Sequence, residues 1–160
     1  MQIQAGLYKG RRVKTVKNAP YRPTASTVRK SLFDILGNLK GKCVLDLFAG
    51  SGIVGFEAAS RGASTITFVE SSMRVNSLLK INGSLFKQTD FKYIKQDATR
   101  FITKCGDYDI IFADPPYDFE YINYEKVVQP LFHSICLPLP FGCWGSCFCR
   151  RAHCGELGFF

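Results

Sequence analysis

The stretch Asp114-Pro115-Pro116-Tyr117 places a carboxylate, two rigid backbone carbonyls and an aromatic ring within four residues. It follows an apolar run over residues 108–113, which is typical of a buried strand. Because proline lacks a backbone N–H and fixes its φ angle, the strand must end there. A planar substrate with an amino group fits this corner, since its ring can stack on Tyr117 while its amine donates to Asp114 and the Pro115 carbonyl. The motif alone is equally compatible with an ordinary turn that ends a strand.

A glycine-rich turn lies earlier in the chain, after a short apolar strand that ends in Asp46. Gly50 and Gly52 lack Cβ atoms, so the backbone there can take positive φ and approach a ligand closely. The helix predicted over residues 53–60 offers unpaired N–H groups at its amino terminus. With Gly55, the turn matches the G-x-G-x-x-G pattern of dinucleotide-binding proteins. Asp46 argues against a dinucleotide, because a carboxylate repels a pyrophosphate and attracts the ammonium group of an amino acid.

Two further predicted strands also close on acids. Residues 64–70 are rich in β-branched side chains and end in Glu70, and residues 91–97 end in Asp97. An acid at the place of Glu70, about twenty residues after such a turn, typically binds the ribose hydroxyls of a nucleoside cofactor. Glu70 also suits the start of a helix. Asp97 either accepts from an adenine amino group or caps a helix over residues 98–104.

Strands and helices alternate along the chain to about His133, which predicts an α/β fold with a mostly parallel sheet flanked by helices. Open α/β sheets bind ligands beyond the carboxyl ends of their strands. We therefore expect Asp46, Glu70, Asp97 and Asp114 to lie at one edge of the sheet, around a bound ligand.

In this order and spacing, these motifs resemble class I S-adenosylmethionine-dependent methyltransferases that act on exocyclic amino groups. The segments QAGLYKGRR (4–12) and YRPTASTVRKSLF (21–33) are similar to the start of the RsmD family, which methylates N2 of one guanine in small-subunit ribosomal RNA. The similarity runs from about Ile3 to Leu131. It implies a Rossmann-like fold, S-adenosyl-L-methionine as the cofactor, and ribosomal RNA or an assembling small ribosomal subunit as the partner.

The resemblance also implies a role for each motif, with Glu70 at the ribose of the cofactor and Asp97 at its adenine. The residues it places at the cofactor are Asp46, Phe48, Ala49, Gly50, Ser51, Gly52, Glu70 and Asp97. The residues it places at the target base, as the catalytic set, are Asp114, Pro115, Pro116 and Tyr117. Adenine-N6 methyltransferases share the last motif, so adenine stays an alternative target. An RNA-binding protein without catalytic activity is a further alternative.

Positive charge is concentrated at the amino terminus. The first forty residues contain nine Lys or Arg and one acid, Asp34, so they carry the whole net charge of +8. A local cationic surface favours a phosphate backbone as its partner, and such binding weakens steeply with salt. A merely solvated basic arm is the alternative. The residues expected to contact RNA are Arg11, Arg12, Lys14, Arg22, Thr24 and Arg29.

Two elements are expected within this basic part. Residues 9–14 predict a turn and an edge strand. Residues 24–37 predict an amphipathic helix that ends at Gly37. The residues expected on its apolar face are Val28, Leu32, Ile35 and Leu36.

At 160 residues and 46% hydrophobic content, the chain is long enough for one domain with a substantial core. It contains no apolar run of membrane-spanning length and no apolar segment typical of a signal peptide. We therefore expect a cytoplasmic monomer that does not contact membranes. We divide it into a basic RNA-binding extension and helix (1–40), a cofactor-binding core (41–135) and an aberrant tail (136–160).

The tail departs abruptly from the pattern of the RsmD family. It holds five of the seven cysteines, and the residues that suggest zinc are Cys143, Cys147, Cys149, His153 and Cys154. Their spacing lacks the paired C-x2-C arrangement of zinc sites, so we expect no metal. A change of reading frame after about Ser134 is our favoured explanation, and a diverged functional tail or a metal site are the alternatives. We expect the sheet to be incomplete at its carboxyl-terminal edge, with the strand beyond Asp114 uncovered there and the tail mobile.

Overall fold

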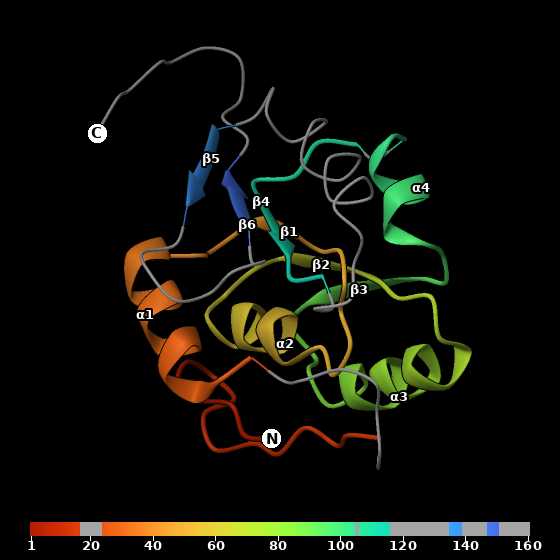
Figure 1. Cartoon of the computed structure of the whole chain (residues 1–160). Helices are drawn as coiled ribbons and strands as arrows, with labels where there is room; N and C mark the ends of the chain where they lie inside the picture. The colour runs from red at the N-terminus through yellow and green to blue at the C-terminus, as the bar shows by residue number, and fades with distance from the viewer. Residues whose placement is uncertain (17–23, 105, 116–134, 139–146, 151–160) are drawn as a thin grey trace.

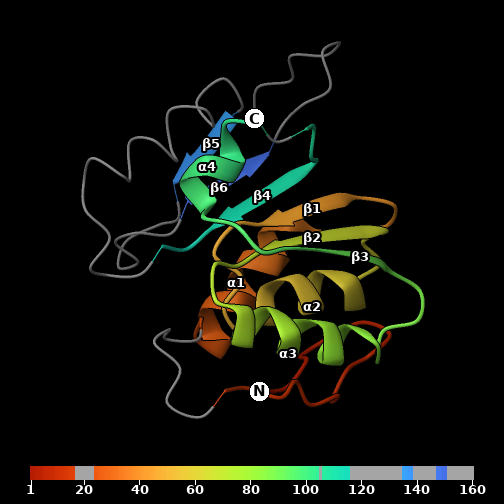
Figure 2. The same ribbon diagram turned by 90° about the vertical axis from the view of Figure 1, so that its right-hand side faces the viewer.

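The computed structural model describes residues 1–16, 24–104, 106–115, 135–138 and 147–150. Four neighbouring strands of a twisted sheet are parallel, in the spatial order β3-β2-β1-β4, as Figures 1 and 2 show. Their bounds are β1 Cys43–Asp46, β2 Thr65–Val69, β3 Asp90–Ile94 and β4 Ile110–Ala113. The helices are α1 Ser26–Leu36, α2 Ile53–Ser60, α3 Met73–Gly83 and α4 Ala98–Ile102. The predicted α/β fold with a mostly parallel sheet is confirmed.

Both faces of the sheet are covered, because successive side chains of a strand point to opposite faces. Val44 and Ile110 belong to the apolar cluster on the side of α1, α2 and α3, whereas their neighbours Leu45 and Ile111 belong to the cluster that includes Ile102 of α4. Figure 2 shows α1, α2 and α3 on one face and α4 on the other. The nearly continuous apolar sequence of β1 and β4 is what strands buried on both faces require.

The amino-terminal segment packs beneath the helices rather than extending from the fold (Figure 1). Ile3 and Val13 are 1% and 2% exposed and belong to the main core cluster. Ile3 N donates to Arg11 O at 2.9 Å, and Val13 N donates to Met1 O at 2.8 Å, so residues 1–13 close a narrow hairpin. The turn covers residues 7–10, and an isolated antiparallel bridge between Gln2 and Arg12 stands in place of the predicted edge strand.

Helix α1 presents a different face to the core from the one predicted. Phe33 is buried and its ring lies 6.0 Å from that of Phe112, whereas Ile35 is 62% exposed. Leu32 is buried and Leu36 is partly buried, as expected. Helical spacing admits two overlapping apolar stripes here, and the larger Phe33 ring occupies the core in place of Ile35.

The backbone of two short strands extends the sheet beyond β4. Strand β6 (Cys147–Arg150) pairs antiparallel with β4, and β5 (Ile135–Pro138) pairs antiparallel with β6. Strand β4, which precedes Asp114, is paired on this side, since the backbone of Ile111 pairs with that of Cys149. The sheet is not closed, and within the described part of the chain β3 and β5 form its edges.

Candidate functional site

The turn between β1 and α2 has the backbone conformation that its glycines predict. Gly50 and Gly52 have φ angles of 48° and 71°, in the left-handed region that side chains disfavour. A Cβ atom on Gly52 would also lie 2.4 Å from the Leu79 side chain, so packing adds to the requirement for glycine. Gly52 N donates to Ala49 O at 2.6 Å, and Ser51 Oγ accepts from Ile53 N at 3.3 Å. These bonds fix the loop against the amino terminus of α2.

Gly55, the third glycine of the pattern, has a packing role. A Cβ atom there would lie 2.4 Å from the Phe68 ring of β2. The glycine therefore lets α2 approach the sheet closely, whichever ligand the loop binds.

Asp46 is buried at the end of β1 with an unsatisfied carboxylate. It is 6% exposed, and its Oδ2 atom is buried without a hydrogen-bond partner. Burial raises the pKa of this carboxyl from 3.8 to about 7, a hydrogen bond from the Gly55 backbone opposes the rise, and the charges of Asp114 and Glu70 add to it. Leaving a buried polar atom unpaired costs about 1–3 kcal/mol, so the geometry favours a ligand that donates hydrogen bonds here, above all a cationic one.

Glu70 ties the glycine loop to the start of α3. Its Oε2 accepts from Gly50 N at 3.0 Å, and its Oε1 accepts from Ser72 N at 2.8 Å. An ionised carboxylate has about four acceptor positions, so these bonds leave capacity for hydroxyl donors. Glu70 therefore has a structural part in the loop, in addition to any contact with a ribose.

Asp97 occupies the cap of α4, one of the two roles that its position suggested. It lies three residues beyond β3, and its Oδ1 accepts from Thr99 N at 2.9 Å, from Arg100 N at 3.2 Å and from the Thr99 hydroxyl. The Thr99 hydrogen bond is the largest cause that lowers the pKa of Asp97. Helix α4 ends at Ile102 rather than at residue 104.

Asp114 follows β4 and accepts a hydrogen bond from a residue of the amino-terminal part of the chain. Thr24 Oγ1 donates to Asp114 Oδ2 at 3.3 Å, and the two residues are ninety positions apart. Pro115 directly follows, whereas Pro116 and Tyr117 lie outside the described residues. Asp46 pairs in parallel register with Phe68 and Phe112, and Glu70 and Asp114 each follow two residues later, so these three carboxylates lie at the carboxyl ends of adjacent strands. The structure thus brings together three of the four predicted acids.

The predicted RNA contacts separate into exposed and buried residues. Arg12 and Lys14 are exposed on the amino-terminal segment. Arg11 is also exposed, but its guanidinium lies over the Tyr8 ring at 4.8 Å and donates to the Leu85 carbonyl. Arg29 differs, because it is only 4% exposed. Arg22 lies outside the described residues.

Arg29 acts inside the fold. Its Nη1 donates to Thr24 O at 2.8 Å and its Nη2 to Gln2 O at 3.3 Å, so it holds the start of α1 against the amino-terminal segment. Burial lowers its pKa, and the charge of Glu57 opposes that change. An arginine so engaged positions Thr24 and is not part of the exposed basic surface.

Glu57 is a structural residue that the sequence analysis missed. It is fully buried in α2 and accepts from Gln4 N at 2.8 Å, Ala5 N at 3.0 Å and Arg61 Nε at 3.1 Å. Helix α2, which begins at the glycine loop, therefore anchors the basic segment directly. The signal was available, since Glu57 is the single charged residue in an otherwise apolar or small helix, IVGFEAAS.

One family model covers most of this chain. The family described as "Conserved hypothetical protein 95" matches residues 1–138. The chain belongs to this family. The match ends at Pro138, close to the point where the sequence analysis placed the departure of the tail.

Two curated relatives carry the same name. The Ribosomal RNA small subunit methyltransferase D of Haemophilus influenzae is 34% identical over 74% of this chain and 65% of its own length. The protein of the same name from Escherichia coli K12 is 33% identical over 73% of this chain and 60% of its own length. The chain thus spans less than two thirds of these relatives. The resemblance to the RsmD family is confirmed.

Solved structures support the same fold. A chain from Escherichia coli superposes with a TM-score of 0.75 at 24% identity, over 96% of this chain and 99% of that chain. Within the described residues, no helix is both long and apolar enough to cross a membrane.

Proposed function

We propose that this member of the family transfers a methyl group from S-adenosyl-L-methionine to the exocyclic N2 amine of a guanine in small-subunit ribosomal RNA. The observation that carries the proposal is the buried, unpartnered Oδ2 of Asp46 beside the Gly50–Gly52 turn, with Asp114 close by. The names of the relatives support the reaction and the RNA, and the exposed Arg12 and Lys14 are consistent with a phosphate backbone.

The residues present fit the cofactor. Asp46 would bind its ammonium group, and Glu70 would bind its ribose hydroxyls. The part of the cofactor between these groups would contact the loop of Phe48, Ala49, Gly50, Ser51 and Gly52. When bound, the cofactor supplies a sulfonium methyl group, which is already a reactive donor. Catalysis by the protein is then mostly a matter of positioning. Asp97 uses Oδ1 for the cap of α4, so only its other carboxylate oxygen would accept a hydrogen bond from the adenine amino group.

The target amine is held by the turn after β4. Asp114 and the Pro115 carbonyl would accept hydrogen bonds from the two N–H groups of the amine and orient the nitrogen lone pair toward the methyl group. The negative charge of Asp114 would also favour the positive charge that develops on this nitrogen. Pro116 and Tyr117 complete the predicted site, with the Tyr117 ring stacked on a base that has left its neighbours in the RNA.

The experiment separates binding from chemistry. Calorimetry with S-adenosyl-L-methionine measures cofactor affinity, and a labelled methyl group is then offered on naked small-subunit RNA and on assembling subunits. We expect N2-methylguanosine after nuclease digestion and mass spectrometry. Asp114→Asn should keep cofactor affinity within about threefold and lower the transfer rate by about a hundredfold or more.

Other outcomes favour the alternatives. N6-methyladenosine in the digest would identify an adenine methyltransferase. Cofactor and RNA binding without any transfer would favour the RNA-binding protein without catalytic activity. Binding of NADH in place of the sulfonium cofactor would refute the whole class.

A further inference from the structure

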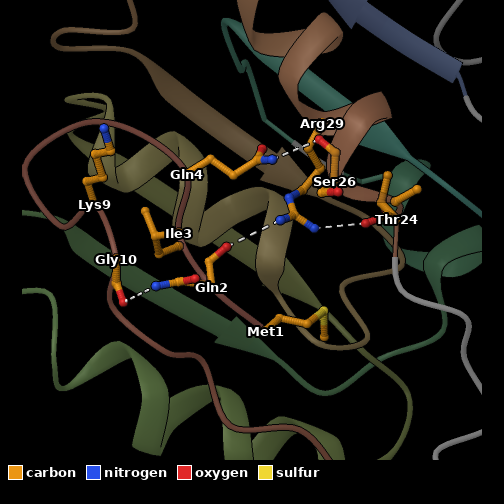
Figure 3. Close-up of a pocket in the computed structure, with 10 residues that line it drawn as sticks. Met1, Gln2, Ile3, Gln4, Lys9, Gly10, Thr24, Ser26 and Arg29 are labelled. Carbon is orange, nitrogen blue, oxygen red and sulfur yellow. Dashed lines mark hydrogen bonds between the residues drawn. The ribbon is translucent and has the colours of Figure 1, made fainter.

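A pocket lies between the amino-terminal segment and the start of α1. It has a volume of about 610 Å³, within the range of about 300–1,000 Å³ typical of small-molecule sites. Figure 3 shows its walls converging from both elements. The described lining residues are Met1, Gln2, Ile3, Gln4, Lys9, Gly10, Thr24, Ala25, Ser26 and Arg29.

The chemistry of this lining favours an anion. The described lining residues include Lys9 and Arg29 and no Asp or Glu. Helix α1 begins at Ser26 without a side-chain cap, and the first N–H groups of a helix have no partner within it. A helix amino terminus with nearby cations is a common site for phosphate.

Two buried polar atoms of the pocket residues lack partners. Gln4 Oε1, an acceptor, and Arg29 Nε, a donor, are buried without a hydrogen bond. Arg29 is 4% exposed, and its guanidinium faces the pocket between Gln2 and Thr24 (Figure 3). Natural proteins seldom leave such groups unsatisfied. A ligand that offers both a donor and an acceptor would form hydrogen bonds with these two atoms after a small adjustment of the two side chains.

One wall of the pocket is shared with the candidate active site. Thr24 lines the pocket, and its hydroxyl donates to Asp114 at 3.3 Å. Arg29 in turn holds the Thr24 carbonyl at 2.8 Å. A ligand in the pocket therefore lies one residue away from the carboxylate that we assign to the target amine.

From this geometry we infer that the pocket binds a nucleotide next to the target guanine in the same RNA strand. Its phosphate lies at the start of α1 near Arg29, and its base edge meets the Gln4 side chain. This inference rests on the proposed function and adds a subsite to it. The pocket would hold the flanking nucleotide while the target base turns toward Asp114.

The decisive variant places a negative charge on the pocket wall. Ser26→Asp suits the first turn of a helix, where acids are stabilising, so the fold should survive. Ser77→Asp makes the same change on exposed α3, away from the pocket lining, and serves as the control. We expect Ser26→Asp to raise KM for the RNA about tenfold with kcat and cofactor affinity unchanged, and Ser77→Asp to change KM less than twofold.

A binding measurement keeps the inference testable without catalysis. Adenosine and uridine 5′-monophosphates, and the same nucleosides without phosphate, are titrated against the labelled full chain by nuclear magnetic resonance. We expect the monophosphates to shift the backbone amides of Gln4 and Ser26 more than the nucleosides do. If RNA methylation fails but these shifts appear and are lost in Ser26→Asp, the proposed function is wrong and the pocket still binds nucleotides. Equal effects of Ser26→Asp and Ser77→Asp, or shifts confined to the Gly50–Gly52 turn, would overturn the inference.

Discussion

Asp46 should lower the stability of the protein when no cofactor is bound, because its buried carboxylate lacks the hydrogen-bond donor that a ligand would supply. Its carboxylate is buried, and one oxygen lacks a partner. We expect Asp46→Asn to make the protein more stable at pH 8 in the absence of cofactor, and to weaken binding of S-adenosyl-L-methionine by about tenfold to a hundredfold.

The magnitude follows from the raised pKa. Because the pKa of Asp46 rises from 3.8 to about 7 on folding, the folded protein holds a proton that the unfolded chain releases. Stability is therefore lost as pH rises through the interval from about 4 to 7. The full difference corresponds to about 4 kcal/mol above pH 7. The amide of asparagine still needs hydrogen bonds in the same place, so we expect a net gain of about 1–3 kcal/mol.

The assay is urea unfolding of both proteins at pH 5 and pH 8 without cofactor. The parent should lose stability between these two values relative to Asp46→Asn, and thermal melting at pH 8 should shift upward by about 3–10 °C. Asp34→Asn, on the exposed face of α1, is the control and should follow the parent. If parent and Asp46→Asn depend on pH in the same way, or if the variant is less stable at pH 8, the reasoning about the buried carboxylate is refuted.

Three further predictions test the supports of the site. Gly6→Ala should destabilise the protein by about 2 kcal/mol or more, because its Cβ would lie 1.9 Å from Ser60 O at a φ of 82°. Limited proteolysis should then cleave the amino-terminal segment, and a segment that stays intact would contradict this prediction. Reversing the charges of Arg12 and Lys14 should weaken RNA binding and lower its log–log salt slope by at least about 1, with cofactor affinity unchanged; an unchanged slope would leave them as solvated charges. Asp97→Ala should lower the free energy of unfolding, measured with urea at pH 7, by about 1 kcal/mol, because the cap of α4 is lost. Since the pKa of Asp97 is lowered on folding, this difference from the parent should shrink as pH falls below 3.8. A difference that stays constant with pH would exclude the capping carboxylate.

Local pattern in the sequence predicted the elements that carry the candidate site. The strand ending in Asp46 and the helix over residues 53–60 are present with the expected bounds. The positive φ angles of Gly50 and Gly52 follow equally from residue type, since glycine alone takes that conformation at little cost. Such features depend on neighbours in the sequence, and so the sequence alone determined them.

Tertiary packing decided which side chains meet. Nothing local predicts that Thr24 donates to Asp114, that Glu57 holds Gln4, or that Arg29 is buried as a support for Thr24. The exposure of Ile35 also differs from expectation for this reason. Each of these features depends on how distant segments pack into one core. Several arrangements satisfy the same local periodicity, and the packing of the largest side chains together with the backbone hydrogen bonds of the whole sheet selects one of them.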